Sequence, residues 1–85
     1  MLAKRDALNI AGKLGAEIKN GGDHDLAVFR FEGKRILQYG IRRSSGGHDY
    51  LQRQLHISLR QCQDLSNCPL SLSQYIEILR AKNLL

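Results

Sequence analysis

The sequence predicts an α+β fold in which a three-stranded antiparallel sheet carries its helices on one face. Three observations support this prediction: an amphipathic helical stripe opens the chain, three short β-forming segments separated by turn residues follow, and helix-capping signals occupy the second half. The expected order is one helix, three strands and then two or three short helices. With 85 residues the chain has room for a single domain, residues 1–85, with a thin core.

The first helix is predicted over residues 3–14, where apolar residues recur at helical spacing. Gly15 follows at the position that suits a C-terminal cap. Residues 16–19 alternate between apolar and polar side chains, which is typical of a short strand, and the turn residues at 20–23 end that strand.

A β-hairpin is predicted over residues 26–42, with strands at 26–31 and 35–42. Residues 32–34 lie between these strands and supply a turn of three residues. This turn length sets a register in which His24 lies opposite Arg42. A two-residue turn would shift the pairing by one residue.

This register assigns the side chains of the hairpin to two faces, because alternate residues of a strand point in opposite directions. The face expected to join the core holds Ala27, Phe29, Phe31, Arg35, Leu37 and Tyr39. The other face holds His24, Leu26, Val28, Arg30, Ile36, Gln38, Gly40 and Arg42. Its polar and basic side chains suggest a functional surface, although its three apolar residues equally suit a face covered by helices or by a partner.

The second half of the chain is predicted to be helical. Asp49 is the expected N-cap of a short helix over residues 50–56. Ser58 and Ser71 each begin an S-x-x-Q capping box, and the last helix is expected to run to about residue 83. The first two of these helices are also similar to a helix-turn-helix, but two short packed helices explain the same pattern and are favoured.

Composition and missing motifs exclude several classes of function. Thirteen Lys and Arg against eight Asp and Glu give a formal net charge of +5, which favours polyanions such as RNA as partners. A secretory signal and an apolar stretch of about 20 residues are both missing, so a cytoplasmic protein with no membrane partner is expected. Cys62 and Cys68 lack the second ligand pair of a zinc site and are expected to be part-buried thiols. No Walker, HExxH or GxSxG motif is present.

The segment GGDHD at residues 21–25 carries the strongest indication of chemistry, because it places an imidazole at the start of a strand after a flexible turn. Histidine takes up and releases protons near neutral pH. The two flanking aspartates favour the imidazolium form of His24, which suits a general acid or a phosphate contact. A surface histidine without function is the alternative. His48 is a minor candidate for the same chemistry, and His56 is expected to be structural.

Basic and amide side chains of the hairpin are the predicted RNA-binding residues: Arg30, Lys34, Arg35, Gln38, Arg42 and Arg43. The basic ones gather at the hairpin turn and at the end of the last strand, where they could hold phosphates while His24 acts nearby. The alternative is a set of solvated charges without a ligand.

The order of these features resembles the HicA-type toxins of bacterial toxin-antitoxin pairs. A first helix ends in Leu14-Gly15, the G-x-H element GDH at 22–24 opens a strand, a hairpin follows, and ILRAKNL at 78–84 ends the last helix. The resemblance implies a fold like that of double-stranded-RNA-binding domains and an mRNA endoribonuclease whose catalytic residue is His24. It also implies a HicB-type antitoxin as partner, and neither a metal nor a cofactor.

In such an enzyme a ribose 2′-hydroxyl would attack its adjacent phosphate, with His24 transferring a proton and Arg30, Arg42 or Lys34 stabilising the developing charge. Two functions of other classes stay open. A non-catalytic nucleic-acid-binding module would use the same face, with salt-sensitive binding and no cleavage. A protein-docking domain would use Leu26 and Val28 to bind a partner or to form a homodimer, and salt-insensitive dimerisation would favour it.

Overall fold

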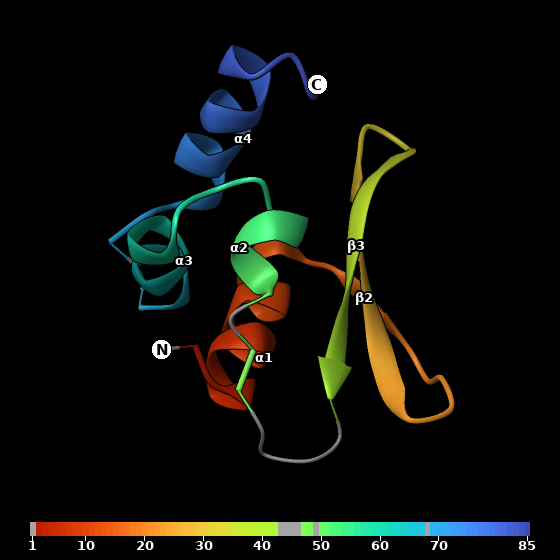
Figure 1. The fold of residues 1–85 in the computed structure, drawn as a ribbon. Coiled ribbons are helices and arrows are strands. Elements are labelled where there is room, and N and C mark those ends of the chain that lie inside the picture. The colour runs from red at the N-terminus through yellow and green to blue at the C-terminus, as the bar shows by residue number, and fades with distance from the viewer. Residues whose placement is uncertain (1, 43–46, 49, 68) are drawn as a thin grey trace.

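The helices lie on one side of a three-stranded sheet (Figure 1). The computed structural model describes residues 2–42, 47–48, 50–67 and 69–85. Its elements are α1 (Lys4–Leu14), β1 (Glu17–Lys19), β2 (His24–Phe31), β3 (Lys34–Arg42), α2 (Leu51–Gln54), α3 (Leu59–Ser66) and α4 (Leu72–Ala81). Both strand pairs are antiparallel and β2 is central. The predicted α+β fold with its order of elements is confirmed.

The first helix forms as expected and is tied to α3 by a buried aspartate. Ala7, Ile10, Ala11 and Leu14 face the core, and Gly15 ends the helix with a φ of 64°. At the other end, Oδ2 of Asp6 accepts a hydrogen bond from the Ala3 amide at 2.8 Å, and Oδ1 accepts one from the Ser66 hydroxyl at 2.8 Å. Asp6 therefore caps α1 and fixes its first turn against α3.

The hairpin of β2 and β3 has the predicted register over most of its length but a shorter turn. His24 pairs with Arg42 and Ala27 pairs with Tyr39, as expected. The turn consists of Glu32 and Gly33 alone, with φ angles of 53° and 81°, and two positive φ angles in succession are typical of a type I′ turn. The prediction of a three-residue turn is therefore wrong.

Because the turn is one residue shorter than predicted, β3 has one residue more than β2 can pair with, and this residue forms a β-bulge. Phe29 pairs with Leu37 but Arg30 pairs with Arg35, so Ile36 is the extra residue. The bulge reverses the faces on the side of the turn: Arg35 lies across from Arg30, and Ile36 packs against the core. The predicted faces of Arg35 and Ile36 are therefore wrong, because the polar and apolar alternation does not reveal a bulge, whereas the other residues of the hairpin from His24 to Phe29 and from Leu37 to Arg42 lie on the predicted faces.

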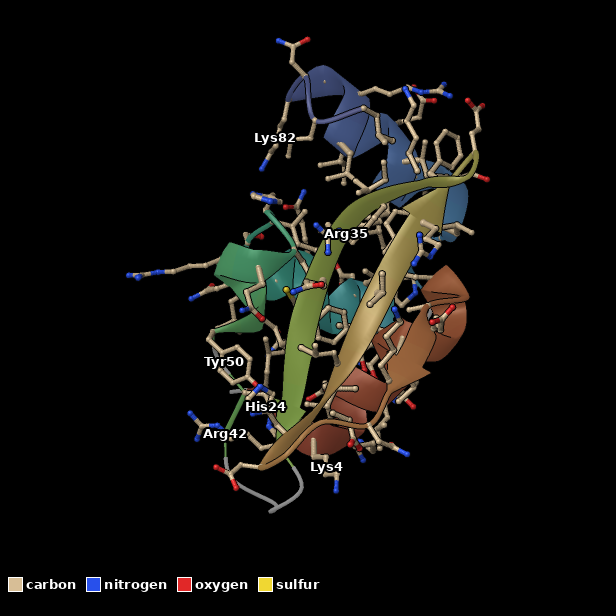
Figure 2. All side chains as sticks on the ribbon, turned by 90° about the vertical axis from the view of Figure 1, so that its right-hand side faces the viewer. Lys4, His24, Arg35, Arg42, Tyr50 and Lys82 are labelled. Atoms are coloured by element: carbon tan, nitrogen blue, oxygen red, sulfur yellow. The ribbon has the colours of Figure 1, made fainter. Side chains whose placement is uncertain are left out.

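The sheet face opposite the helices is called the open face below. Its residues are Glu17 and Lys19 on β1, His24, Leu26, Val28 and Arg30 on β2, and Arg35, Gln38, Gly40 and Arg42 on β3. Among the described residues no helix crosses this face (Figures 1 and 2). Val28 is nevertheless only 3% exposed, since it lies between Glu17 of β1 and Gln38 of β3.

The core fills the space between the sheet and the helices and is closed by two tyrosines. The Tyr39 hydroxyl donates to the Ala7 carbonyl and the Tyr75 hydroxyl donates to the Leu55 carbonyl, both at 2.9 Å.

The two predicted capping boxes, at Ser58 and Ser71, are confirmed with both of their hydrogen bonds. Asp49 and Cys68 lie outside the described residues, and no described helix is long and apolar enough to cross a membrane.

Three ionisable groups in this core have shifted proton affinities. The Cys62 thiol is 0% exposed, and burial raises its pKa from about 9 to about 12, with the nearby Asp6 carboxylate adding to the effect. Burial is also the main cause that raises the pKa of the Tyr39 and Tyr75 hydroxyls above their usual value near 10. All three groups therefore hold their protons more tightly in the folded chain than in the unfolded chain.

The free energy of unfolding is expected to fall as the pH rises above about 9. The unfolded chain releases the Cys62 proton from about pH 9, whereas the folded chain keeps it until about pH 12, so alkali favours the unfolded state. The fall amounts to about 1.4 kcal/mol per pH unit for each such group. Urea unfolding between pH 7 and pH 11 measures it, and Cys62→Ala should show a shallower slope above pH 9. Stability that stays constant over this range would contradict the expectation.

Candidate functional site

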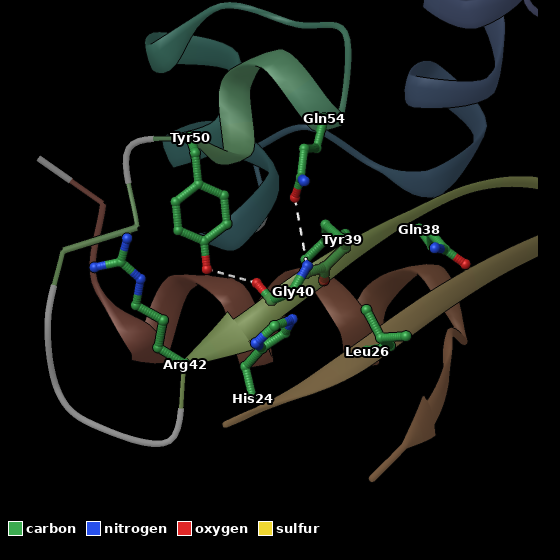
Figure 3. A pocket seen from close by; sticks show the side chains of 8 residues that line it. All are labelled: His24, Leu26, Gln38, Tyr39, Gly40, Arg42, Tyr50 and Gln54. Atoms are coloured by element: carbon green, nitrogen blue, oxygen red, sulfur yellow. Dashed lines mark hydrogen bonds between the residues drawn. The ribbon is translucent and has the colours of Figure 1, made fainter. Parts of the chain in front are cut away.

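His24 begins β2 at one end of the open face. Its side chain is exposed, and the ring lies against the backbone of Gly40 on the neighbouring strand (Figure 3). A Cβ atom on residue 40 would lie 2.9 Å from Cδ2 of His24 and 3.4 Å from its Nε2. Glycine at position 40 therefore leaves the room that the imidazole occupies, as strand glycines do where another group approaches closely.

The peptide groups of Gly40 are bonded by two side chains that reach over the edge of the sheet. The Tyr50 hydroxyl donates to the Gly40 carbonyl at 2.6 Å, and the Gly40 amide donates to Oε1 of Gln54 at 3.4 Å (Figure 3). Because β3 is an edge strand, these side chains occupy positions where the backbone of a further strand would pair. They join both ends of the short helix α2 to β3 near the end of the hairpin.

Arg42 places a positive charge beside His24, its partner across the two strands. The guanidinium carbon of Arg42 lies 5.3 Å from the centre of the Tyr50 ring, within the range of a cation–π contact. Burial raises the pKa of the Tyr50 hydroxyl, although the neighbouring Arg42 acts in the opposite direction. The Tyr50 hydroxyl therefore stays protonated near neutral pH and remains a hydrogen-bond donor.

These side chains surround a pocket of about 350 Å³ at the edge of the sheet. It is lined by His24, Leu26, Gln38, Tyr39, Gly40, Arg42, Tyr50 and Gln54. This volume lies at the small end of the range for small-molecule sites, roughly 300–1,000 Å³. An imidazole, a guanidinium, two side-chain amides and a phenol thus meet around one opening.

The structure brings most of the predicted RNA-binding residues onto the face of His24, but not to one point. Arg30, Arg35 and Gln38 share the open face with His24 and Arg42, and Arg35 donates to the Gln38 side chain at 3.3 Å. Figure 2 shows Arg35, His24 and Arg42 along this face. Arg30 lies six positions along β2 from His24, which corresponds to roughly 20 Å. Of the predicted basic residues that the structure describes, Arg42 is the one that pairs with His24 and lines the same pocket.

Two other predicted RNA-binding residues are not part of this group. Lys34 pairs with the half-buried Phe31 at the tip of the hairpin and lines a different pocket, together with Ile36 and Arg80. Its ammonium group therefore does not stabilise charge beside His24. Arg43 lies outside the described residues.

The structure gives the other two histidines supporting positions. His48 is 0% exposed, its Nε2 accepts a hydrogen bond from the Arg42 amide at 3.1 Å, and its own amide donates to the Leu2 carbonyl at 2.9 Å. Such burial contradicts the minor prediction that His48 performs acid–base chemistry on a substrate. His56 has a φ of 62°, and its carbonyl accepts a hydrogen bond from the Lys82 ammonium group.

Comparisons with known proteins do not identify the chain. No family model, curated protein or solved structure matches it. Within the described ranges, no three or more His, Cys, Asp and Glu side chains form a group that could hold a metal ion. The chemistry of the pocket is therefore the basis for assigning a function.

Gly40, Tyr50 and Gln54 are among the pocket residues that the sequence did not indicate as site residues. Gly40 was assigned only to the open face, Tyr50 only to a short helix, and Gln54 to no site. A glycine inside a strand is a general signal of close approach by another group, and it could have directed attention to Gly40. Nothing in the local pattern indicates that Tyr50 and Gln54 reach back over β3, because this depends on the path of the chain after the hairpin.

Proposed function

We propose that this chain is an endoribonuclease that cuts mRNA at the His24 pocket. The observation that supports it most is the exposed imidazole of His24, which shares one pocket with its cross-strand partner Arg42 on the open face of a basic domain. Imidazole transfers protons near neutral pH, and guanidinium groups stabilise charge on phosphate oxygens. RNA brings its own nucleophile, so the protein needs to supply only these functions.

The proposed reaction is a phosphoryl transfer within the RNA strand. The 2′-oxygen of one ribose loses its proton and bonds to the adjacent phosphorus, while the bond from phosphorus to the 5′-oxygen of the next nucleotide breaks. That 5′-oxygen takes up a proton, and the products are a 2′,3′-cyclic phosphate and a 5′-hydroxyl. His24 transfers one of the two protons, a water molecule transfers the other, and Arg42 stabilises the negative charge that grows on the non-bridging oxygens.

The charge distribution around His24 supports binding of a polyanion. Asp25 pairs with the buried Ile41, so alternation along β2 directs its side chain to the face opposite that of His24. Of the two flanking aspartates, only Asp23 therefore remains near the approach to the imidazole. Arg30 and Arg35 lie farther along the open face and would contact phosphates away from the cut.

The apolar side chains of the domain favour RNA over a protein-docking role for the open face. Val28 is 3% exposed, and Leu26 is half-buried in the wall of the pocket. The large apolar side chains that are exposed among the described residues are Leu8, Ile18, Leu84 and Leu85, none of which belongs to the open face. The open face therefore presents mainly polar and basic groups.

The biological setting that we propose is that of a HicA-like toxin in the cytoplasm. It would cut mRNA, and a HicB-like antitoxin would cover the open face and block access to His24. The support is the order of elements, one helix and three strands followed by helices on the same face, together with the histidine at the start of the second strand. The resemblance implies a first helix, a strand, a hairpin and a last helix, and α3 is an additional helix that a minimal member of the family lacks. The likeness to double-stranded-RNA-binding domains is part of this proposal.

Incubation of the purified chain with end-labelled single-stranded RNA, and with DNA of the same sequence, tests this function. RNA is expected to be cut in the presence of excess EDTA, whereas DNA, which lacks the 2′-hydroxyl, stays intact. A single 2′-deoxyribose at a mapped cut site should block cleavage there. RNA that is bound but never cut would overturn the catalytic proposal and leave a binding module, and cleavage that EDTA abolishes would contradict the proposed chemistry.

A further inference from the structure

The pocket has two chemically different ends, with His24 and Gly40 between them. At one end the Arg42 guanidinium lies by Tyr50, and at the other end are the side-chain amides of Gln54 and Gln38, of which Gln38 already accepts a hydrogen bond from Arg35 (Figure 3). A nucleotide has the same two parts, since it carries an anionic phosphate and a neutral base with hydrogen-bonding edges. The proton transfer proposed above uses His24 and Arg42 and leaves the amide end without a role.

We infer that the amide end binds one unpaired nucleobase next to the cut bond, and that Gln54 determines which base is accepted. This inference rests on the proposed function, because it places the phosphate at Arg42 and the ribose 2′-hydroxyl near His24 of the same pocket. Proteins that recognise RNA sequence generally bind unstacked bases of single strands and contact their edges.

The hydrogen bonding of Gln54 suits a group that exchanges its partner for a ligand. Its Oε1 accepts from the Gly40 amide at 3.4 Å, beyond the usual 2.7–3.2 Å for such bonds, and the residue is exposed. A side-chain amide offers a donor and an acceptor together, which is the combination that reads a base edge. A base entering the pocket could bond with Gln54 and also receive the Gly40 N–H.

The remaining walls suit the flat faces of a base and fix the position of the site. Leu26 lines the pocket and is half-buried, so it contributes apolar surface that a base would cover. The 2.6 Å hydrogen bond from Tyr50 to the Gly40 carbonyl holds the start of α2 against β3. Tyr50 therefore acts as a positioning residue for the amide end, while Gln54 makes the contact that discriminates between bases.

Sequencing of the cut sites in a random RNA pool tests the inference with the wild type and Gln54→Ala. The wild type is expected to favour one base beside the cut, and Gln54→Ala should lose on the order of 10-fold of that preference. Alanine suits a helix, and Gln54 is exposed, so the variant should fold. Gln52→Ala, in the same helix but outside the pocket lining, is the matched control and should keep the preference.

The outcomes separate the inference from the proposed function. If the wild type cuts RNA and Gln54→Ala keeps its base preference, the inference is overturned and the function stands. If the wild type cuts no RNA, NMR titration with the four ribonucleoside 3′-monophosphates decides. Amide signals of Gly40 and Gln54 that shift by an amount depending on the base, and a Gly40 signal that no longer shifts in Gln54→Ala, would support base binding without the proposed cleavage. Titrations that leave these signals unmoved overturn it.

Discussion

The His24→Ala variant is expected to lose RNA cleavage by a factor of about 10² to 10⁴, the usual contribution of a positioned acid or base. His24 is exposed and is the first residue of β2. Removing its ring should therefore leave the free energy of unfolding within roughly 0.5 kcal/mol of the wild type. Initial rates of cleavage of labelled RNA measure the first effect, and urea unfolding measures the second. Growth arrest on expression should disappear together with the cleavage.

His56→Asn is the matched control, because His56 is also exposed and asparagine tolerates the positive φ of 62° at this position. It should cleave RNA at the wild-type rate. If His24→Ala cleaves RNA at the full rate or still arrests growth, the imidazole of His24 has no role in the mechanism. This conclusion holds even if His56→Asn behaves as expected.

Gly40→Ala tests the position of the same imidazole without removing it. The added Cβ would lie 2.9 Å from Cδ2 of His24, so the ring must leave its place over the strand. A displacement of about 1 Å in a catalytic group can cost on the order of 10² in rate. We expect kcat to fall while the affinity for RNA, carried by the arginines of the open face, stays near that of the wild type.

The His48→Ala variant is expected to lose about 2–4 kcal/mol of unfolding free energy, the range typical of a large buried side chain cut back to alanine. The His48 ring is 0% exposed and accepts the hydrogen bond of the Arg42 amide, so its removal leaves both a cavity and an unpaired donor. The total stability of an 85-residue domain is of order 4–13 kcal/mol, so this loss is a large part of it.

Urea unfolding and thermal melting measure this loss, and the melting temperature should fall by at least about 10 °C. His48→Gln, which keeps an acceptor near the Arg42 amide, should lose less stability than His48→Ala. A loss below about 0.5 kcal/mol in His48→Ala would mean that this imidazole does not support the end of β3 as its burial indicates.

The fold was predictable from the sequence where local chemistry determines it. The stripe of α1, the C-cap at Gly15 and the capping boxes at Ser58 and Ser71 all depend on neighbouring residues, and all were confirmed. The pairing of His24 with Arg42 was correct because two errors cancelled: the turn is one residue shorter than predicted, and the bulge at Ile36 restores the count. Neither error is visible in the alternation of side chains.

The site was predictable only in part, because its walls come from distant parts of the chain. His24 follows from its place after a flexible turn, and Arg42 follows from the register. Tyr50 and Gln54 contact Gly40 only because α2 folds back beside the edge strand, which is a property of the tertiary structure. The burial of His48 has the same origin, so the pattern of the sequence did not distinguish its imidazole from the exposed one of His24.

The chemical nature of the RNA ends tests the central claim most directly. Fragments produced by the purified wild-type chain in the presence of EDTA can be analysed by mass spectrometry. Attack by the 2′-oxygen with His24 as proton donor or acceptor predicts 2′,3′-cyclic phosphates on the upstream fragments and 5′-hydroxyls on the downstream ones. Fragments with 3′-hydroxyl and 5′-phosphate ends would show attack by water and would contradict the mechanism assigned to the His24 pocket.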